Sequence, residues 1–196
     1  MTNISSPLES NRIRTIYLLR HGHSEFQARV EAGRPSSDLV DTGLYAIGRK
    51  QVKTLADLAP VIFDVVVSSP LTRAIETALA VVGPTSSAPL IVNPLVRERL
   101  DDFCDIGRPA TVLSSAYPNL DFTGLPEIWW HNGPEDERGL PVEPWKSLTD
   151  RVERFKEWTA TRKEQSILIV SHSDFLYSLT GTRLPNCQLQ KWEEAD

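Results

Sequence analysis

Three short polar clusters each follow an apolar run of the sequence, and each contains a histidine or an arginine. They are RHGHSE at 20–25, SSPLTR at 68–73 and SHSD at 171–174. The carboxyl ends of strands border the ligand crevice in open α/β sheets, so the clusters can meet there. Two histidines and two arginines in one small volume would repel each other unless an anion lay between them. A phosphate group fits this need, because the planar fork of arginine matches its oxygens.

The segments that must position these clusters alternate between strands and helices. Apolar runs predict buried strands at 15–19, 61–67, 89–92 and 166–170, and helical patterns predict helices at 44–58, 71–82, 147–158 and 175–179. Residues 1–13 are expected to form a loose lead-in and 28–43 a loop, with Pro60 ending one helix and Ser147 capping another. The alternation predicts an α/β fold, a three-layer α/β/α sandwich with a mainly parallel central sheet.

The least regular part of the chain is residues 99–146, which contain six prolines and the adjacent Trp129 and Trp130. We expect short helices and a folded excursion there, because tryptophans are costly to leave in water. The tryptophans could wall a substrate pocket or pack within the excursion. A length of 196 residues suits one domain. The sequence therefore predicts a single domain over residues 1–196, with an inserted cap-like excursion at about 99–146.

The polar clusters resemble the signature of the histidine phosphatase superfamily, also called the phosphoglycerate-mutase-like family. Its Arg-His-Gly-x-Ser/Thr motif is similar to residues 20–24, its second arginine to Arg73 within SPLTRAIETA, and its later strand-histidine element to Val170-Ser171-His172. The segments DTGLYAIGRKQ at 41–51 and NCQ at 186–188 resemble further family elements. One RHG tripeptide would be weak evidence, but three elements in order, from about Ile13 to Trp192, are specific.

The resemblance implies that His21 attacks phosphorus and becomes a phosphohistidine, which divides the reaction into two displacements. A carbonyl on the other ring nitrogen would fix the required tautomer. Arg20, Arg73 and His172 would hold the phosphoryl oxygens and stabilise the transition state. The residues expected to bind substrate are Gly22, Ser24, Gln27 and Ser173. Because side chains supply the positive charge, no metal and no other cofactor is expected.

The leaving group needs a proton donor, and the family places a glutamate in a Leu-x-Glu setting that resembles Glu98. A nearby phosphate is expected to raise the pKa of Glu98. Arg97 and Arg99 are expected to point away from it, because side chains alternate along an extended segment. The second choice of proton donor is one of the acidic residues Asp101, Asp102 and Asp105.

The chain departs from the usual family pattern at a few positions. Gln27 stands where an asparagine is common, and it can donate the same hydrogen bond from a longer stem. His23 replaces a usual acid or amide and is expected at the mouth of the pocket. Ser173 replaces a common glycine, and Asp174 after it would either orient His172 or repel the substrate phosphate.

The composition narrows the classes of protein. With 21 basic and 26 acidic residues, the net charge of −5 argues weakly against a nucleic-acid binder. Cys104 and Cys187 are too few for a disulfide framework or a thiolate metal site. No signal peptide or membrane span is visible, so a cytoplasmic location without a membrane partner is expected. The expected partner is a small-molecule phosphate ester, and the oligomeric state is open.

Three functions remain open at this point. The first is a phosphatase for a small organic phosphate monoester, with water as the final acceptor. The second is a mutase, which the resemblance makes less favoured because mutases of the family commonly carry extra enclosing segments. The third is a lyase, an isomerase or a binding protein that reuses the fold, since a fold does not fix a function.

Overall fold

The computed structural model describes residues 14–58, 62–83 and 86–192, and within them the chain builds one five-stranded sheet. The strands are β1 (Thr15–Arg20), β2 (Val65–Ser68), β3 (Leu90–Val92), β4 (Ser166–Ser171) and β5 (Leu189–Trp192). Their order is β3-β2-β4-β1-β5. All neighbouring pairs are parallel except β1 and β5, which are antiparallel. The sheet is therefore mainly parallel, as the sequence predicts.

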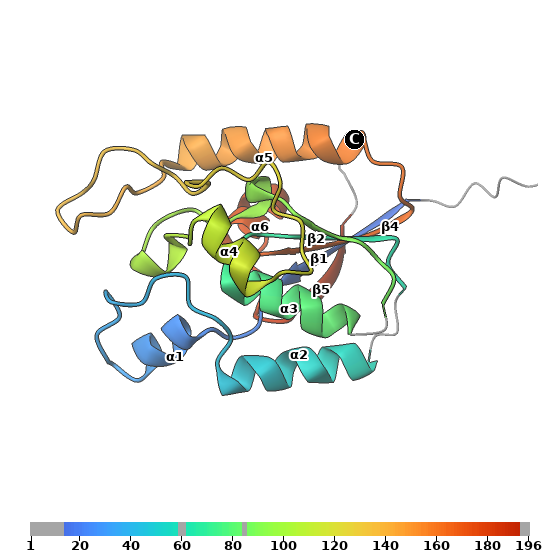
Figure 1. Cartoon of the computed structure of the whole chain (residues 1–196), viewed down its shortest axis with the longest axis horizontal. Coiled ribbons are helices and arrows are strands. Elements are labelled where there is room, and N and C mark those ends of the chain that lie inside the picture. The colour runs from blue at the N-terminus through green and yellow to red at the C-terminus, as the bar shows by residue number, and fades with distance from the viewer. Residues whose placement is uncertain (1–13, 59–61, 84–85, 193–196) are drawn as a thin grey trace, which may run out of the picture.

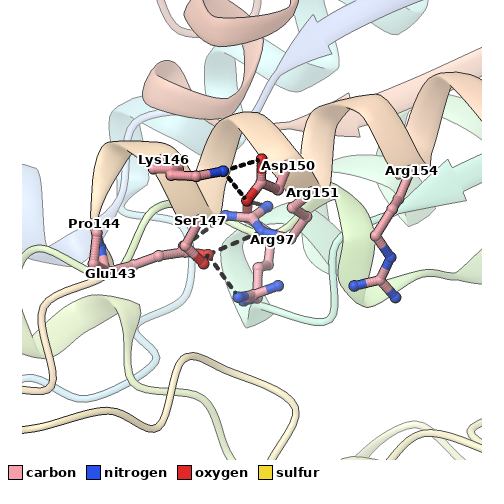
Figure 2. Close-up of a pocket in the computed structure, with 8 residues that line it drawn as sticks. All are labelled: Arg97, Glu143, Pro144, Lys146, Ser147, Asp150, Arg151 and Arg154. Atoms are coloured by element: carbon pink, nitrogen blue, oxygen red, sulfur yellow. Dashed lines mark hydrogen bonds and ion pairs between the residues drawn. The ribbon is translucent and has the colours of Figure 1, made fainter.

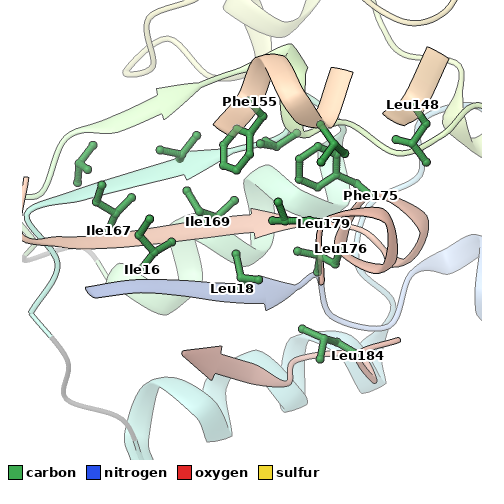
Figure 3. Close-up of a cluster of buried hydrophobic side chains, with 14 residues drawn as sticks. Ile16, Leu18, Leu148, Phe155, Ile167, Ile169, Phe175, Leu176, Leu179 and Leu184 are labelled. Carbon is green, nitrogen blue, oxygen red and sulfur yellow. The ribbon is translucent and has the colours of Figure 1, made fainter. Parts of the chain in front are cut away.

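Helices cover both faces of this sheet (Figure 1). They are α1 (Glu25–Glu31), α2 (Ala46–Leu58), α3 (Thr72–Val82), α4 (Ala110–Ala116), α5 (Trp145–Ala160) and α6 (Ser173–Thr180). On one face, Phe155 of α5 and Phe175 of α6 pack against Ile167 and Ile169 of β4 (Figure 3). Successive side chains of a strand point to opposite faces. Leu168 and its neighbours therefore pack on the side of α2 and α3.

Burial on both faces explains why the central strands are continuous apolar runs rather than alternating ones. Every residue of β2 is buried, and so are all residues of β4 except the first. This arrangement confirms the predicted three-layer α/β/α fold.

The excursion between β3 and α5 packs on the amino-terminal half of α3. Leu113, Phe122 and Trp129 form a buried cluster with Leu71 and Ile75. The indole N–H of Trp129 donates a hydrogen bond of 2.9 Å to the carbonyl oxygen of Arg108. Trp129 therefore packs within the excursion. The cap-like role of this segment and the single-domain organisation stay predictions.

Several predicted boundaries are wrong, and two of them have a local physical reason. The first residues of the expected loop at 28–43 belong to helix α1, which runs to Glu31. Ser24 caps this helix: its side chain accepts the N–H of Gln27, and the Gln27 side chain accepts the N–H of Ser24. Ser147 does not cap α5, which already begins at Trp145 after Pro144. The hydroxyl of Ser147 donates to Glu143 within the first turn.

Strand β2 begins at Val65, later than the predicted run 61–67. Asp64 precedes it and accepts the N–H groups of Gln165 and Ser166 with its side chain. The expectations for residues 1–13 and Pro60 fall outside the described residues.

Candidate active site

The carboxyl ends of β1, β2 and β4 border a pocket of about 210 Å³. Register brings the two histidines together, because Arg20 of β1 pairs with Ser171 of β4, and His21 and His172 follow them directly. The N–H of His21 donates to the carbonyl oxygen of Ser171 at 3.0 Å. The two imidazole rings lie with their centroids 4.9 Å apart. The described residues that line the pocket are Arg20, His21, Ser24, Phe26, Gln27, Arg73, Glu98, Arg99, Asp101, Asp102, Cys104, Asp105 and Asp174.

The ring of His21 is buried and held in one tautomer. Its Nδ1 lies 2.7 Å from the carbonyl oxygen of Gly22. A carbonyl can only accept, so Nδ1 carries the proton and Nε2 keeps a free lone pair. Burial and the charge of Arg73 hold the pKa of His21 well below 6.5. A neutral imidazole with an unprotonated Nε2 is the form that a nucleophilic histidine needs.

The ring of His172 is fully buried beside His21. Within the described residues, neither of its ring nitrogens has a hydrogen-bond partner. Burial, Arg73 and His21 hold its pKa well below 6.5. A buried polar group without a partner costs about 1–3 kcal/mol. A ligand oxygen that accepted a hydrogen bond from His172 would remove this cost.

Two arginines approach the histidines from different elements. Arg73, in the first turn of α3, donates at 2.7 Å to the carbonyl oxygen of Cys104 and at 2.7 Å to the carboxylate of Asp105. Arg20, the last residue of β1, donates from Nη1 to the carbonyl oxygen of Leu184 at 2.9 Å. These bonds fix the direction of each guanidinium, and both guanidiniums line the pocket.

A threonine explains part of the sequence around the second arginine. Thr77, one turn after Arg73 on α3, donates its hydroxyl to the Arg73 carbonyl at 2.7 Å. The same hydroxyl accepts the N–H of Gly22 at 3.0 Å. Thr77 therefore ties the loop that carries His21 to the helix that carries Arg73.

Glu98 lines the same pocket as His21 and lies at the amino end of α6. Its Oε1 accepts the N–H groups of Arg99, Asp174 and Phe175 at 3.0, 3.1 and 3.2 Å. Oε1 is thus saturated with donors, whereas Oε2 has only a 3.3 Å contact with the N–H of Asp174. Burial and the carboxylates of Asp105 and Asp174 raise the pKa of Glu98 to about 7. The cause differs from the expected one, because protein groups raise it without any phosphate.

The expected alternation of side chains around Glu98 holds for Arg97 and is wrong for Arg99. Arg97 turns away from the pocket and pairs with Glu143 at 2.9 Å. Arg99 lines the same pocket as Glu98. It pairs with Asp174 at 3.0 Å and with Asp101, so two carboxylates balance its charge.

Not every expected substrate-binding residue reaches the pocket. Ser24 and Gln27 line it, whereas Gly22, Ser173 and the fully buried His172 are not among its described lining residues. The backbone of Gly22 packs against Gly48 of α2, and the hydroxyl of Ser173 accepts from Arg183 at 3.0 Å.

His23 and Asp174 also differ from expectation. His23 pairs with Glu31 of α1 at 3.0 Å and is not among the residues that line the pocket. Asp174 lines the pocket, but its carboxylate bonds Arg99 and Arg183.

Sequence reasoning missed the part that Asn186 takes in the site. Its Nδ2 donates to the carbonyl oxygen of His21 at 2.9 Å and to Oε1 of Gln27 at 3.2 Å. Gln27 donates back to Oδ1 of Asn186 at 3.1 Å. The signal was present in the NCQ segment at 186–188, which resembles a family element, but only the fold places it beside residue 21.

A second pocket, of about 420 Å³, lies along α5 (Figure 2). Three of the residues that line it hold the segment that carries Glu98. The buried Glu143 pairs with Arg97 and, at 2.7 Å, with Arg151. Arg151 in turn donates to the carbonyl oxygens of Leu95, Arg97 and Glu98 at 2.9, 2.7 and 3.3 Å. Glu143 therefore offsets part of the charge of the two arginines, and the cluster fixes the backbone that presents Glu98.

Within the described ranges, no group of three or more histidine, cysteine, aspartate or glutamate side chains is placed to hold a metal ion. The thiol of Cys104 is buried against Arg73 and Asp105, and burial raises its pKa. Among the same residues, no helix is both long and apolar enough to span a bilayer.

Comparison with known proteins identifies the family. Residues 16–195 match the histidine phosphatase superfamily (branch 1). A phosphoglycerate mutase-like protein of Arabidopsis thaliana is 27% identical, with 90% of this chain and 77% of the relative covered. A glucosyl-3-phosphoglycerate phosphatase of Mycolicibacterium vanbaalenii is 28% identical, with 88% of this chain and 75% of the relative covered.

A solved structure shares the fold. The α-ribazole phosphatase of Shigella flexneri superposes with a TM-score of 0.60 at 24% identity, covering 90% of this chain and 89% of that one. The family match spans nearly the whole chain and includes every strand and helix that borders the pocket. The chain therefore belongs to the histidine phosphatase superfamily.

Proposed function

We propose that this chain hydrolyses a small organic phosphate monoester through a phosphohistidine formed on Nε2 of His21. The superfamily, together with phosphatases among the relatives, supports a phosphatase activity. The observation that carries the proposed mechanism is the state of His21. Its Nδ1–H is bound to the Gly22 carbonyl, its pKa is lowered, and its ring lies among Arg20, Arg73 and His172.

In the first step, the Nε2 lone pair of His21 attacks phosphorus and the bond from phosphorus to the ester oxygen breaks. Arg20, Arg73 and His172 hold the phosphoryl oxygens, whose charge is spread in a loose transition state. Preorganised donors of this kind stabilise that charge without reorganisation. The positive charge of this scheme comes from side chains alone.

Glu98 supplies the proton that the departing oxygen needs. Its raised pKa leaves a substantial fraction protonated near neutral pH, and Oε2 is the oxygen with room for the proton. In the second step the Glu98 carboxylate takes a proton from water, and that water oxygen attacks phosphorus. The bond from phosphorus to Nε2 then breaks, which frees inorganic phosphate and restores neutral His21.

A trapping experiment tests the mechanism. The protein is mixed with a ³²P-labelled monoester, quenched within milliseconds, and the label is followed through acid and alkali. We expect label that alkali preserves and acid removes, as for a phosphoramidate, located on the peptide that contains His21. His21→Ala should carry no label and lose turnover, while His131→Ala, a histidine outside the pocket lining, is the matched control.

The same experiment separates the alternatives. Turnover by His21→Ala at the wild-type rate would refute the mechanism. Strict dependence on a bisphosphorylated primer, with little phosphate release, would indicate a mutase. Absence of both label and turnover across a broad set of monoesters would indicate a binding protein or another chemistry on this fold.

A further inference from the structure

The lining of the active-site pocket contains more carboxylates than arginines. Five lining residues carry a carboxylate and three carry a guanidinium. The carboxylates belong to Glu98, Asp101, Asp102, Asp105 and Asp174, and the guanidiniums to Arg20, Arg73 and Arg99. A pocket that accepts a phosphate dianion despite this balance must hold its positive charge at the phosphoryl end. The side that faces the alcohol portion of the substrate is then the acidic side.

The groups around the phosphoryl oxygens are already assigned. In the proposed function, Arg20 and Arg73 hold the phosphoryl oxygens, and Glu98 is the proton donor. Asp105 is buried and paired with Arg73 at 2.7 Å. These four groups leave Arg99, Asp101, Asp102 and Asp174 to face the rest of the substrate.

Arg99 has no charge to spare for a substrate carboxylate. Its Nε bonds Asp174 at 3.0 Å, and its Nη2 forms an ion pair with Asp101. Its Nη1 donates to the carbonyl oxygen of Glu143 at 3.2 Å, and the guanidinium stacks 4.5 Å from the centroid of the Trp145 ring. Two carboxylates, a carbonyl and an aromatic face therefore fix it in place.

Asp102 is a carboxylate of the pocket lining that forms no ion pair with a lining arginine, and the exposed Arg138 nearby offsets only part of its charge. It is half-buried, and its Oδ1 accepts the N–H of Phe103 at 2.8 Å, which caps the 3-10 helix Phe103–Asp105. Within the described residues it has no ion-pair partner. The wall that α1 and its cap contribute consists of Ser24, Phe26 and Gln27, none of which is charged. A like charge set beside such a carboxylate is disfavoured, and an opposite charge is attracted.

We propose that this site selects phosphate monoesters whose alcohol portion carries an ammonium group and rejects those whose alcohol portion carries a carboxylate, with Asp102 as the principal determinant and Asp101 beside it. This inference rests on the proposed phosphatase function. A pocket of about 210 Å³ suits a phosphoryl group joined to a short amino alcohol.

Three commercially available esters of similar size test the proposal: O-phosphoethanolamine with an ammonium group, sn-glycerol 3-phosphate without further charge, and 3-phosphoglycerate with a carboxylate. We expect kcat/KM to fall in that order, with at least about tenfold between the first and the last, because the electrostatic term changes sign. Asp102→Asn should reduce this ratio severalfold. Asparagine caps a helix as well as aspartate does, so the variant keeps its backbone.

The matched control is Asp121→Asn. Like Asp102, Asp121 accepts a nearby backbone N–H, that of Thr123 at 2.7 Å, but it is not among the described residues that line the pocket. Its ratio should equal that of the wild type. Two results would overturn the inference and leave the phosphatase function intact. One is a higher kcat/KM for 3-phosphoglycerate than for O-phosphoethanolamine. The other is the same ratio of these two values in Asp102→Asn as in the wild type. Activity on none of the three esters, with turnover of others, would also overturn the inference. Failure of histidine labelling with every ester would instead remove the proposed function.

Discussion

Replacing Glu143 by glutamine should destabilise the protein strongly, although Glu143 lies outside the active-site pocket. Its carboxylate is fully buried and receives Arg97 and Arg151 at 2.9 and 2.7 Å (Figure 2). Glu143→Gln keeps the shape of the side chain but leaves two buried guanidiniums facing a neutral amide. Breaking a buried ion pair by removing one partner costs about 3–5 kcal/mol. In a chain of this length, that lowers Tm by about 6–20 °C.

Asp150→Asn is the matched control, because it makes the same chemical change in the exposed pair with Lys146 on α5, the helix that carries Arg151. Exposed pairs are worth about 0–1 kcal/mol, so its Tm should fall by no more than about 4 °C. Thermal and urea unfolding of both variants give the comparison. Equal stability of Glu143→Gln and Asp150→Asn would refute the reasoning about the buried cluster.

The pH dependence of the stability lost in Glu143→Gln provides a second check on the buried cluster. Burial raises the pKa of Glu143, but the hydrogen bonds and charges of Arg151 and Arg97 prevail and hold it below 4.5. A carboxyl whose folded pKa is depressed contributes stability above its unfolded pKa and loses it as the pH falls. The difference in Tm between wild type and Glu143→Gln should therefore stay constant from pH 7 to about 5 and narrow only as the pH falls below about 4.5. Arg151 also donates a hydrogen bond to the carbonyl oxygen of Glu98, so Glu143→Gln should lower kcat as well as Tm.

Three further predictions concern the site itself. Because the pKa of Glu98 is about 7, kcat/KM of the wild type should fall about tenfold per pH unit above that value. Glu98→Gln should be slower by about 10²–10⁴ and should not show this fall at high pH. A flat pH profile in the wild type would contradict the assignment of Glu98 as the proton donor. Gly48→Ala places a Cβ 2.1 Å from the carbonyl oxygen of His23, so thermal unfolding should show a loss of at least about 1–3 kcal/mol; an unchanged Tm would be inconsistent with this packing. Asn186→Ala removes the hydrogen bond to the His21 carbonyl and should lower kcat/KM by about tenfold with a small change in Tm; full activity would show that the bond does not position His21.

Local sequence patterns were sufficient for the four parallel strands, for most of the long helices and for the three polar clusters, but not for α1 or β5. Apolar runs of fixed length predict the buried strands, because a strand covered on both faces has no polar side. The cap of α1 was nevertheless readable, since Ser24 and Gln27 stand three residues apart as a capping box requires. The resemblance to the family depends on contiguous residues, so it too is a property of the sequence.

The balance of charge around those clusters was decided by tertiary structure. Nothing in the sequence pairs Arg99 with Asp174, which lie 75 positions apart, or places three backbone donors on one oxygen of Glu98. Desolvation and the charges of distant neighbours set the pKa values of Glu98 and His21, and both depend on burial in three dimensions. The sequence thus determined which residues could do the chemistry. Folding decided which of them face one another, how they are protonated, and which charge the rest of the pocket presents to a substrate.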